Sequence, residues 1–558
     1  MLVVLALVLA AVSYINTLGF AFVYDDLPQL VSNPRVHSWE HAPRLFVEQV
    51  WNQSLLQGTG NYYRPIFELW LLIQYSLFGL HPWAYHLVNV LLHMAVVGLA
   101  YLLFRRLTGD RLTASMGTVI FAVHPTHIES VAWISGVTDP LCALFVLGSF
   151  LAYMRARDAG SSTGDRIAWQ VAALALYALA MMSKETAIVV PALLVAYEWL
   201  LARQDSLAAR VRRVTPFVVI TGVYLLVRHW VLFGFMHPEA YSLKSILLTL
   251  PRVLWFYTHQ LVWPVGLSVF YDTPFVVRPG LLDFYLPIVG VAVLAVAVGW
   301  LAKQSRPAAF GAGWMLAMLA PAIVGMYVFI PEELVHDRYL YLPSIGFALM
   351  VAVALRRLSS KGELFGGPRL PVAATLALGG ILAAGTAAQN IYWTNDLLLY
   401  AHGMSVAPRN IDAINLLANE MFKRKNPNSA LALYHHSLEI KPNQWRTHFA
   451  LGITLYELSD YPQATKELEA GISLAPKNSE QYIFLGLSQL SLSNYARAEQ
   501  EFRRAKQLNP RRPGLNRFLA TALLKQGKVE EAKDALRAEV SLTQDRSAAE
   551  ELEKLQRQ

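Results

Sequence analysis

The chain has 558 residues, of which 55% are hydrophobic and 15% are charged, and its formal net charge is +8. Residues 1–392 carry 25 Lys/Arg and 20 Asp/Glu, whereas the much shorter segment 393–558 carries 22 and 19. This shift indicates a membrane part followed by a water-soluble part. The basic excess does not indicate a nucleic-acid partner, because most basic residues of the first part lie in short loops between apolar runs. The single cysteine, Cys142, excludes an intrachain disulfide and a CxxC zinc site.

Apolar stretches in the first part predict about 11 transmembrane helices. The first lacks a basic segment before it and a small-residue cleavage site, so we expect a retained helix and not a signal peptide. The predicted fold class is therefore all-α: a polytopic membrane protein followed by an extracytoplasmic α-solenoid. The predicted spans lie near 2–22, 84–104, 112–130, 139–154, 167–182, 186–202, 214–233, 281–302, 308–330, 338–356 and 370–390.

Five basic loops set the expected orientation. They hold 16 basic and five acidic residues, at 105–111, 155–166, 203–213, 303–306 and 356–369. Such loops face the cytoplasm. With an odd number of spans, the N-terminus is then cytoplasmic and the C-terminal part extracytoplasmic, in a bacterial inner or plasma membrane or, in a eukaryote, the endoplasmic reticulum. Residues 245–270 contain Pro251, Arg252, His259 and Pro264, so we expect them to form a re-entrant or interfacial helix.

The first extracytoplasmic loop, 24–83, opens on two adjacent carboxylates, Asp25 and Asp26. An isolated pair of this kind most simply marks the end of a span, and it becomes a functional candidate only when partners share its membrane face. The topology gathers such partners there. They are Arg64, His124, His127, Glu129, Asp139, Lys184, Glu185, Arg228, Arg252, His336, Asp337, Arg338 and Tyr339.

Several of these residues also have a structural interpretation. Lys184 and Glu185 could compensate each other at a helix end, and Arg338 could pair with the adjacent Asp337. His124, His127 and Glu129 are the candidate metal ligands. Pro125 interrupts them and no fourth ligand is evident, so no metal is assigned and dependence on a divalent metal stays open.

A water-facing pocket that combines these cations with carboxylates suits a polyprenyl-phosphate sugar. Cations bind the phosphate and stabilise the charge that builds on it as the glycosidic bond breaks. Asp25 or Asp26 would take a proton from the incoming hydroxyl. The candidate phosphate ligands are Arg64, Lys184, Arg228, Arg252 and Arg338. The candidate pocket residues are His124, His127, Glu129, Asp139, Glu185, His336, Asp337 and Tyr339.

The second part repeats with a period of 34 residues. Three series share this period: Pro408, Pro442, Pro476 and Pro510; Ala418, Gly452, Gly486 and Ala520; and Ala430, Ala464, Ala498 and Ala532. This period predicts a tetratricopeptide (TPR) solenoid. The predicted domains are 1–392 in the membrane, a connector at 393–410, repeats at 411–544 and a capping tail at 545–558. Such a solenoid either binds a polypeptide in its groove or serves as a spacer.

An ordered set of short motifs resembles the membrane-embedded C-type glycosyltransferases (GT-C). These are YDD at 24–26, YRP at 63–65, HPTHIESVAWISG at 124–136, SKE at 183–185 and DRYLYLP at 337–343. Together with the repeats, they are most similar to protein O-mannosyltransferase-like proteins that join transmembrane helices to TPR repeats. The resemblance implies a lipid-linked sugar donor and inverting transfer at the extracytoplasmic face, with an acidic residue of the first loop, here Asp25 or Asp26, as the base.

The leading hypothesis is transfer of a sugar, with mannose expected, to a Ser/Thr hydroxyl of a protein held by the repeats. A second hypothesis keeps the GT-C site and makes the acceptor a glycan or a lipid. A third is a non-enzymatic scaffold for envelope assembly, although an anchor needs only one or two spans. The inverted repeats typical of a transporter are not evident.

Overall fold

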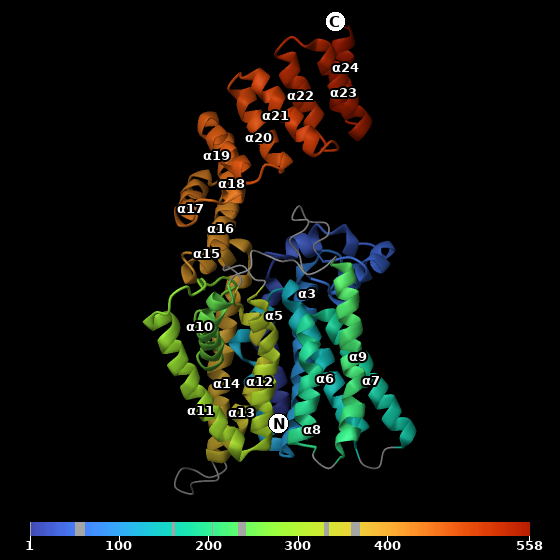
Figure 1. Cartoon of the computed structure of the whole chain (residues 1–558), viewed down its shortest axis with the longest axis vertical. Coiled ribbons are helices and arrows are strands. Elements are labelled where there is room, and N and C mark those ends of the chain that lie inside the picture. Colours follow the sequence, from blue (N-terminus) through green and yellow to red (C-terminus); the bar gives the residue numbers. More distant parts are fainter. Residues whose placement is uncertain are drawn as a thin grey trace. The chain divides into compact units, whose positions relative to one another are not determined.

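The computed structural model describes residues 2–50, 62–158, 162–202, 205–232, 242–327, 334–358 and 369–557 (Figure 1). These residues form helices and loops, with no strand among them, which confirms the all-α prediction. The chain divides into two compact units, Met1–Val406 and Ala407–Gln558. The boundary between them falls inside the predicted connector.

The first unit contains the membrane helices. Its α-helices are α1 (Leu2–Tyr14), α2 (Pro65–Phe78), α3 (Pro82–Thr108), α4 (Arg111–Ala122), α5 (Ile128–Val131), α6 (Thr138–Ala156), α7 (Thr163–Ser183), α8 (Val190–Leu200), α9 (Leu207–Val231), α10 (Leu243–Val262), α11 (Leu286–Gln304), α12 (Arg306–Gly325), α13 (Pro343–Leu358), α14 (Arg369–Gln389) and α15 (Asp396–Val406). Short helical turns join them: η1 (Ile15–Gly19), η2 (Leu27–Val31), η3 (Pro34–Val36), η4 (Trp39–Phe46), η5 (Pro125–His127), η6 (Ser135–Val137), η7 (Glu185–Val189), η8 (Leu281–Tyr285), η10 (Asp337–Leu340) and η12 (Asn390–Trp393).

Within the described ranges, eight helical segments are long and apolar enough to cross a membrane, which makes this a multi-pass membrane protein. They are Leu2–Gly19, Pro82–Thr108, Ser135–Ala156, Thr163–Ser183, Leu207–Val231, Leu281–Gln304, Arg306–Gly325 and Arg369–Trp393.

The count of eleven spans is not confirmed, because the other three predicted spans correspond to the shorter helices α4, α8 and α13. Residues 245–270 mostly form α10, a helix that continues through Pro251 and is not among the eight. Its position in the membrane stays a prediction. The last residues of the predicted spans 214–233 and 308–330, and most of loop 356–369, lie outside the described residues.

The five basic loops lie together at one end of this unit, because their side chains contact one another. The joining contacts are Arg106–Asp158 at 2.8 Å, Arg157–Asp205, Arg356–Asp110 at 3.4 Å and Arg357–Gln304 at 2.7 Å. Figure 1 marks the N-terminus at this end and shows the short helices of the first loop, in blue, at the opposite end. The arrangement agrees with the expected topology, in which the basic loops and the first loop face opposite sides of the membrane.

Local sequence explains how several of these helices begin and end. Asp110 begins α4 by accepting the amides of Leu112 and Thr113, and Gly109, with φ of 68°, ends α3 in the left-handed conformation that glycine adopts without strain. Two glycines also allow α12 and α13 to pack closely. A Cβ on Gly346 would overlap the carbonyl oxygen of Gly311, so α12 and α13 touch through their backbones.

The second unit is built from helix pairs. Its helices are α16 (Ile411–Lys423), α17 (Pro427–Ile440), α18 (Trp445–Glu457), α19 (Tyr461–Leu474), α20 (Ser479–Ser491), α21 (Tyr495–Leu508), α22 (Leu515–Leu524), α23 (Val529–Thr543) and α24 (Arg546–Arg557). Helices end at Val406, Ile440, Leu474 and Leu508, each two residues before one of the periodic prolines. This spacing is expected, because the residue before a proline is disfavoured in helix.

Small residues allow the two helices of a repeat to pack closely. A Cβ on Gly452 would lie 2.7 Å from Leu468, and one on Gly486 would lie 2.6 Å from Phe502. The predicted tail forms α24, and its Ala548 is fully buried against the last repeat. These features are those of a TPR solenoid closed by a capping helix.

Candidate active site

The two adjacent aspartates of the first loop have different surroundings. Asp26 is fully buried, and both its carboxylate oxygens accept hydrogen bonds. Oδ1 accepts the amide of Ser135 at 2.8 Å and its hydroxyl at 2.6 Å, and Oδ2 accepts the amide of Val23 at 3.1 Å. Burial raises the pKa of Asp26 to about 7, although the bonds from Ser135 and Val23 lower it. Asp26 therefore ties the loop to η6, whereas Asp25 is only half-buried.

Three predicted phosphate-binding cations each pair with a predicted acidic pocket residue from another segment. The pairs are Arg64–Glu185, Lys184–Asp139 and Arg338–Glu129. Arg64 is bidentate, with its Nε and Nη2 at 3.0 and 2.6 Å from the two Glu185 oxygens. The alternative pairings with sequence neighbours are therefore wrong, because Lys184 bonds Asp139 and Arg338 bonds Glu129.

These three cations differ in exposure. The side chains of Arg64 and Arg338 are 16% and 18% exposed, whereas that of Lys184 is 4% exposed. Burial lowers the pKa of Lys184 although Asp139 raises it, and the charges of Arg64 and Arg338 lower it further. The three positive charges thus share one region, and the two arginines form its accessible side.

Aromatic rings connect this region to the aspartate loop. The guanidinium of Arg338 lies 5.6 Å from the ring of Trp133 and 5.3 Å from that of Tyr339. Lys184 Nζ lies 5.4 Å from the same Tyr339 ring, and the ring of Tyr24, next to Asp25, lies 5.7 Å from Trp133. The loop and the cations therefore belong to one continuous cluster.

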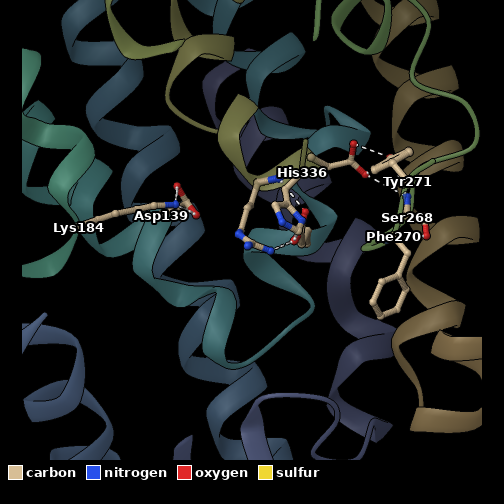
Figure 2. Close-up of polar contacts among 9 residues, drawn as sticks. Asp139, Lys184, Ser268, Phe270, Tyr271 and His336 are labelled. Carbon is tan, nitrogen blue, oxygen red and sulfur yellow. Dashed lines mark hydrogen bonds and ion pairs between the residues drawn. The ribbon is translucent and has the colours of Figure 1, made fainter. Parts of the chain in front are cut away.

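Tyr271 and Ser268 lie on the far side of His336 from Lys184, and both bond Asp337 (Figure 2). Asp337 accepts the hydroxyl of Tyr271 at 2.8 Å and the amide of Ser268 at 3.1 Å. Figure 2 shows His336 between this group and the Lys184 pair, and its Nδ1 lies 3.6 Å from Glu129 Oε1. Asp337 thus binds the segment around Ser268, and His336 lies next to the Arg338–Glu129 ion pair.

The three candidate metal ligands, His124, His127 and Glu129, each contact different residues. His124 contacts the hydroxyl of Thr126 at 2.8 Å and the carbonyl of Leu261 at 3.0 Å, and His127 contacts the hydroxyl of Ser344 at 2.7 Å. Glu129, the third candidate, is bonded to Arg338. In the part of the chain that the structure describes, no three His, Cys, Asp or Glu side chains are grouped to hold a metal ion.

The two remaining predicted phosphate ligands lie on α9 and α10. Arg228 is half-buried in the last turn of α9, one turn beyond Tyr224, whose hydroxyl donates to the Tyr63 carbonyl next to Arg64. This end of α9 therefore adjoins the cluster. Arg252 on α10 instead pairs with Asp283 at 3.1 Å and donates to the Asp272 carbonyl, outside the three pairs.

A cavity of about 10 Å³ lies beside Glu129 and Asp337, with Ser268, Gln389 and His402 among its other lining residues. This volume holds about one water molecule and no sugar.

Sequence reasoning missed Ser135, Trp133 and Tyr271. The first two lie inside the motif at 124–136, but an uncharged hydroxyl or ring carries no signal in a search for ionisable groups. Tyr271 lies nine residues after α10 and directly after the segment 245–270, which the sequence predicted to be a re-entrant or interfacial helix.

Comparison with known proteins gives a family match within the membrane part and relatives that match most of the chain. The family model described as Dolichyl-phosphate-mannose-protein mannosyltransferase matches residues 64–233. The chain is 26% identical to protein O-mannosyl-transferase TMTC4 of Mus musculus over 76% of this chain and 65% of the relative. It is 25% identical to protein O-mannosyl-transferase F38B6.6 of Caenorhabditis elegans, over 72% of this chain and 57% of the relative. The chain thus spans less than two thirds of the length of these curated relatives.

Among solved structures, the chain is similar to MamA from Desulfovibrio magneticus RS-1, with 16% identity and a TM-score of 0.26 over 30% of this chain and 91% of that one. It is also similar to the TPR protein YrrB, with 13% identity and a TM-score of 0.27 over 36% of this chain and 96% of that one. The predicted resemblance is confirmed by the sequence matches: the chain is similar over most of its length to the TMTC protein O-mannosyl-transferases and carries, at 64–233, a region matching the dolichyl-phosphate-mannose-protein mannosyltransferase family.

Proposed function

We propose that this protein is a membrane glycosyltransferase that moves a sugar from a polyprenyl phosphate to a Ser/Thr hydroxyl of a protein at the extracytoplasmic face. The sugar is mannose, because the chain is similar to protein O-mannosyl-transferases. The observation that carries the proposal is the cluster itself. A partly exposed carboxylate, Asp25, lies on a loop that adjoins the cations Arg64, Lys184 and Arg338, in a chain similar to protein O-mannosyl-transferases.

The donor phosphate binds to Arg64 and Arg338. Both side chains are partly exposed, and the Arg338 guanidinium lies within 5.6 Å of the rings of Trp133 and Tyr339. Their carboxylate partners hold them in place before the donor arrives, and a phosphate then shares their N–H groups. Lys184 adds positive charge without contacting the phosphate, because its side chain is only 4% exposed and is paired with Asp139.

Transfer is a single displacement. The acceptor oxygen attacks the anomeric carbon from the side opposite the phosphate, and the bond from that carbon to the phosphate oxygen breaks. The electron pair of this bond passes to the phosphate, where the cations stabilise it. Asp25 takes the hydroxyl proton, and the products are a glycosylated acceptor with inverted configuration and free polyprenyl phosphate.

Asp25 is the base in this proposal because its side chain is partly exposed, whereas Asp26 is fully buried. Both Asp26 oxygens already accept hydrogen bonds inside the protein. A general base must reach the proton of a bound acceptor. The repeats of the second unit bind the polypeptide that carries the acceptor, in the manner of other TPR solenoids.

The test compares Asp25→Asn with Asp26→Asn in purified full-length protein, with polyprenyl-phosphate mannose and a Ser/Thr-rich peptide. We expect Asp25→Asn to lower kcat by about 10²–10⁴-fold without weakening donor binding, since it removes only the base. In Asp26→Asn the amide oxygen still accepts the Ser135 bonds, but the NH2 group cannot accept the Val23 amide, so we expect a loss of kcat smaller than that of Asp25→Asn.

Normal transfer by Asp25→Asn would overturn the mechanism. A wild-type protein that glycosylates a lipid or glycan but no peptide, as seen by mass spectrometry of the products, would overturn the assigned acceptor.

A further inference from the structure

The segment after the last membrane span is bonded to the loop that carries Asp25 and Asp26. The Tyr24 amide donates to Asp396 Oδ1 at 2.8 Å, and the Ala21 amide donates to the Thr394 carbonyl at 3.1 Å. Asp396 is 372 residues from Tyr24 in the sequence. The end of the membrane unit thus contacts the backbone immediately before the proposed base.

The backbone that Asp396 holds is in an uncommon conformation. Tyr24 has φ of 54°, in the left-handed region that L-residues with large side chains rarely occupy. Such a conformation persists only where surrounding contacts impose it, and it is concentrated at functional sites. Here it lies between Val23, whose amide bonds Asp26, and Asp25 itself. The turn at Tyr24 therefore sets the directions in which the two aspartates leave the chain.

Asp396 is itself held on a well-anchored element. It is the first residue of α15, and α15 is fixed by His402, whose Nε2 contacts the Leu267 carbonyl at 2.8 Å and whose ring stacks on Tyr392 at 3.6 Å. Further along α15, Gly403 packs directly on Phe270. The carboxylate that bonds Tyr24 thus projects from a rigid support.

We propose that Asp396 is a positioning residue of the transferase: by accepting the Tyr24 amide it imposes the left-handed turn that directs Asp25 outward toward the acceptor and Asp26 inward toward Ser135. This assignment rests on the proposed function. Asp396 does not touch the reacting atoms and acts through the backbone of the loop.

Two substitutions separate the hydrogen bond from the negative charge. Asp396→Asn removes the charge but keeps an oxygen that can accept the Tyr24 amide. Asp396→Ala removes both. Asn395→Ala is the matched control. The Asn395 side chain accepts the Leu398 amide at 3.1 Å at the start of the same helix, whereas the Asp396 side chain accepts the Tyr24 amide of the aspartate loop.

The experiment measures steady-state transfer from polyprenyl-phosphate mannose to a Ser/Thr peptide by the full chain in detergent, together with hydrogen–deuterium exchange of the peptide covering residues 20–27. Asp396→Ala is expected to lower kcat by about 100-fold, since a displacement of about 1 Å in a reacting group has that effect. Its KM for the donor stays unchanged, and the Tyr24 amide loses protection. Asp396→Asn and Asn395→Ala keep kcat and protection close to those of the wild type.

Several outcomes would overturn the inference. They are unchanged kcat in Asp396→Ala, equal losses in the Asn and Ala variants, and an equal loss in Asn395→Ala, which would indicate a general requirement for α15. The proposed function fails separately: if Asp25→Asn transfers normally, the base is wrong whatever Asp396 does. If Asp25→Asn is inactive and Asp396→Ala is fully active, only the positioning role is wrong.

Discussion

At the scale of single residues, burial separates two chemically identical neighbours. Asp25 and Asp26 share one loop, yet Asp26 is fully buried and bonded by Ser135 and Val23, whereas Asp25 is half-buried. A general base has to be within reach of the acceptor hydroxyl, which full burial prevents for Asp26. In the proposed mechanism Asp26 is therefore a structural residue and Asp25 is the base.

The raised pKa of Asp26 predicts a pH-dependent stability. In the unfolded chain this carboxyl ionises near pH 3.8, and in the folded protein near pH 7. Its contribution to folding is fully present below pH 3.8. Between the two values the folded state holds a proton that the unfolded state has released, so a rise in pH lowers the free energy of unfolding, by at most about 1.4 kcal/mol per pH unit.

Asp26→Asn should remove this dependence, since an amide does not titrate. Thermal unfolding in detergent at pH 5 and pH 7.5 should show Asp26→Asn gaining stability relative to the wild type at the higher pH. Asp25→Asn, which removes a half-buried carboxylate from the same loop, is the control. A difference between Asp26→Asn and wild type that is the same at both pH values would contradict the prediction.

At the scale of elements, the site is assembled by helix packing. Lys184 follows α7, Asp139 lies on α6, and Arg338 lies on η10 just before α13. Each cation reaches its acid only because these helices and turns lie side by side. The backbone contact between α12 and α13 at Gly311 and Gly346 is one of the constraints that place η10.

Gly346→Ala should therefore destabilise the membrane unit by about 1–3 kcal/mol, because its Cβ overlaps the Gly311 carbonyl and the helices must separate. Gly313, which like Gly311 lies on α12, is the control. A Cβ added there meets no atom within 4 Å, so Gly313→Ala should be neutral or slightly stabilising. Thermal unfolding of both variants, with transfer activity measured alongside, checks this. Equal effects in the two variants would rule out the close contact as the cause.

At the scale of the whole molecule, the chain consists of a membrane unit with the candidate site and a solenoid of helix pairs. The membrane unit contains every residue assigned to chemistry, including Asp396 on α15. The solenoid contains none of them. The proposed function therefore gives the two units separable roles, catalysis in the membrane unit and recruitment of the acceptor in the solenoid.

A chain ending at Val406 should keep the candidate site and lose recruitment. We expect its kcat with a short Ser/Thr peptide to stay close to that of the full chain. Its KM for a protein acceptor should rise by about 100-fold, because the second binding site and its effective concentration are gone. Both constants are measured with polyprenyl-phosphate mannose as donor. A truncated chain with unchanged KM for proteins would show that the repeats serve another purpose.

The sequence by itself determined the division into membrane part and TPR solenoid, because hydropathy and a 34-residue period are local patterns that survive without any knowledge of packing. Its short motifs also identified the resemblance to O-mannosyltransferase-like proteins. Sequence patterns further named the ionisable residues of one membrane face, since the alternation of spans and basic loops assigns every loop to a side.

Tertiary structure alone decided which of these residues act together. Arg64 and Glu185 are 121 residues apart, and Arg338 and Glu129 are 209 apart, so their pairing depends on the packing of distant segments. Adjacency in the sequence allowed the pairs Lys184–Glu185 and Arg338–Asp337, but Lys184 pairs with Asp139 and Arg338 with Glu129. The separation of Asp25 from Asp26 has the same origin: Ser135 and Asp396, both remote in sequence, bond the loop from two sides and fix which carboxylate is buried.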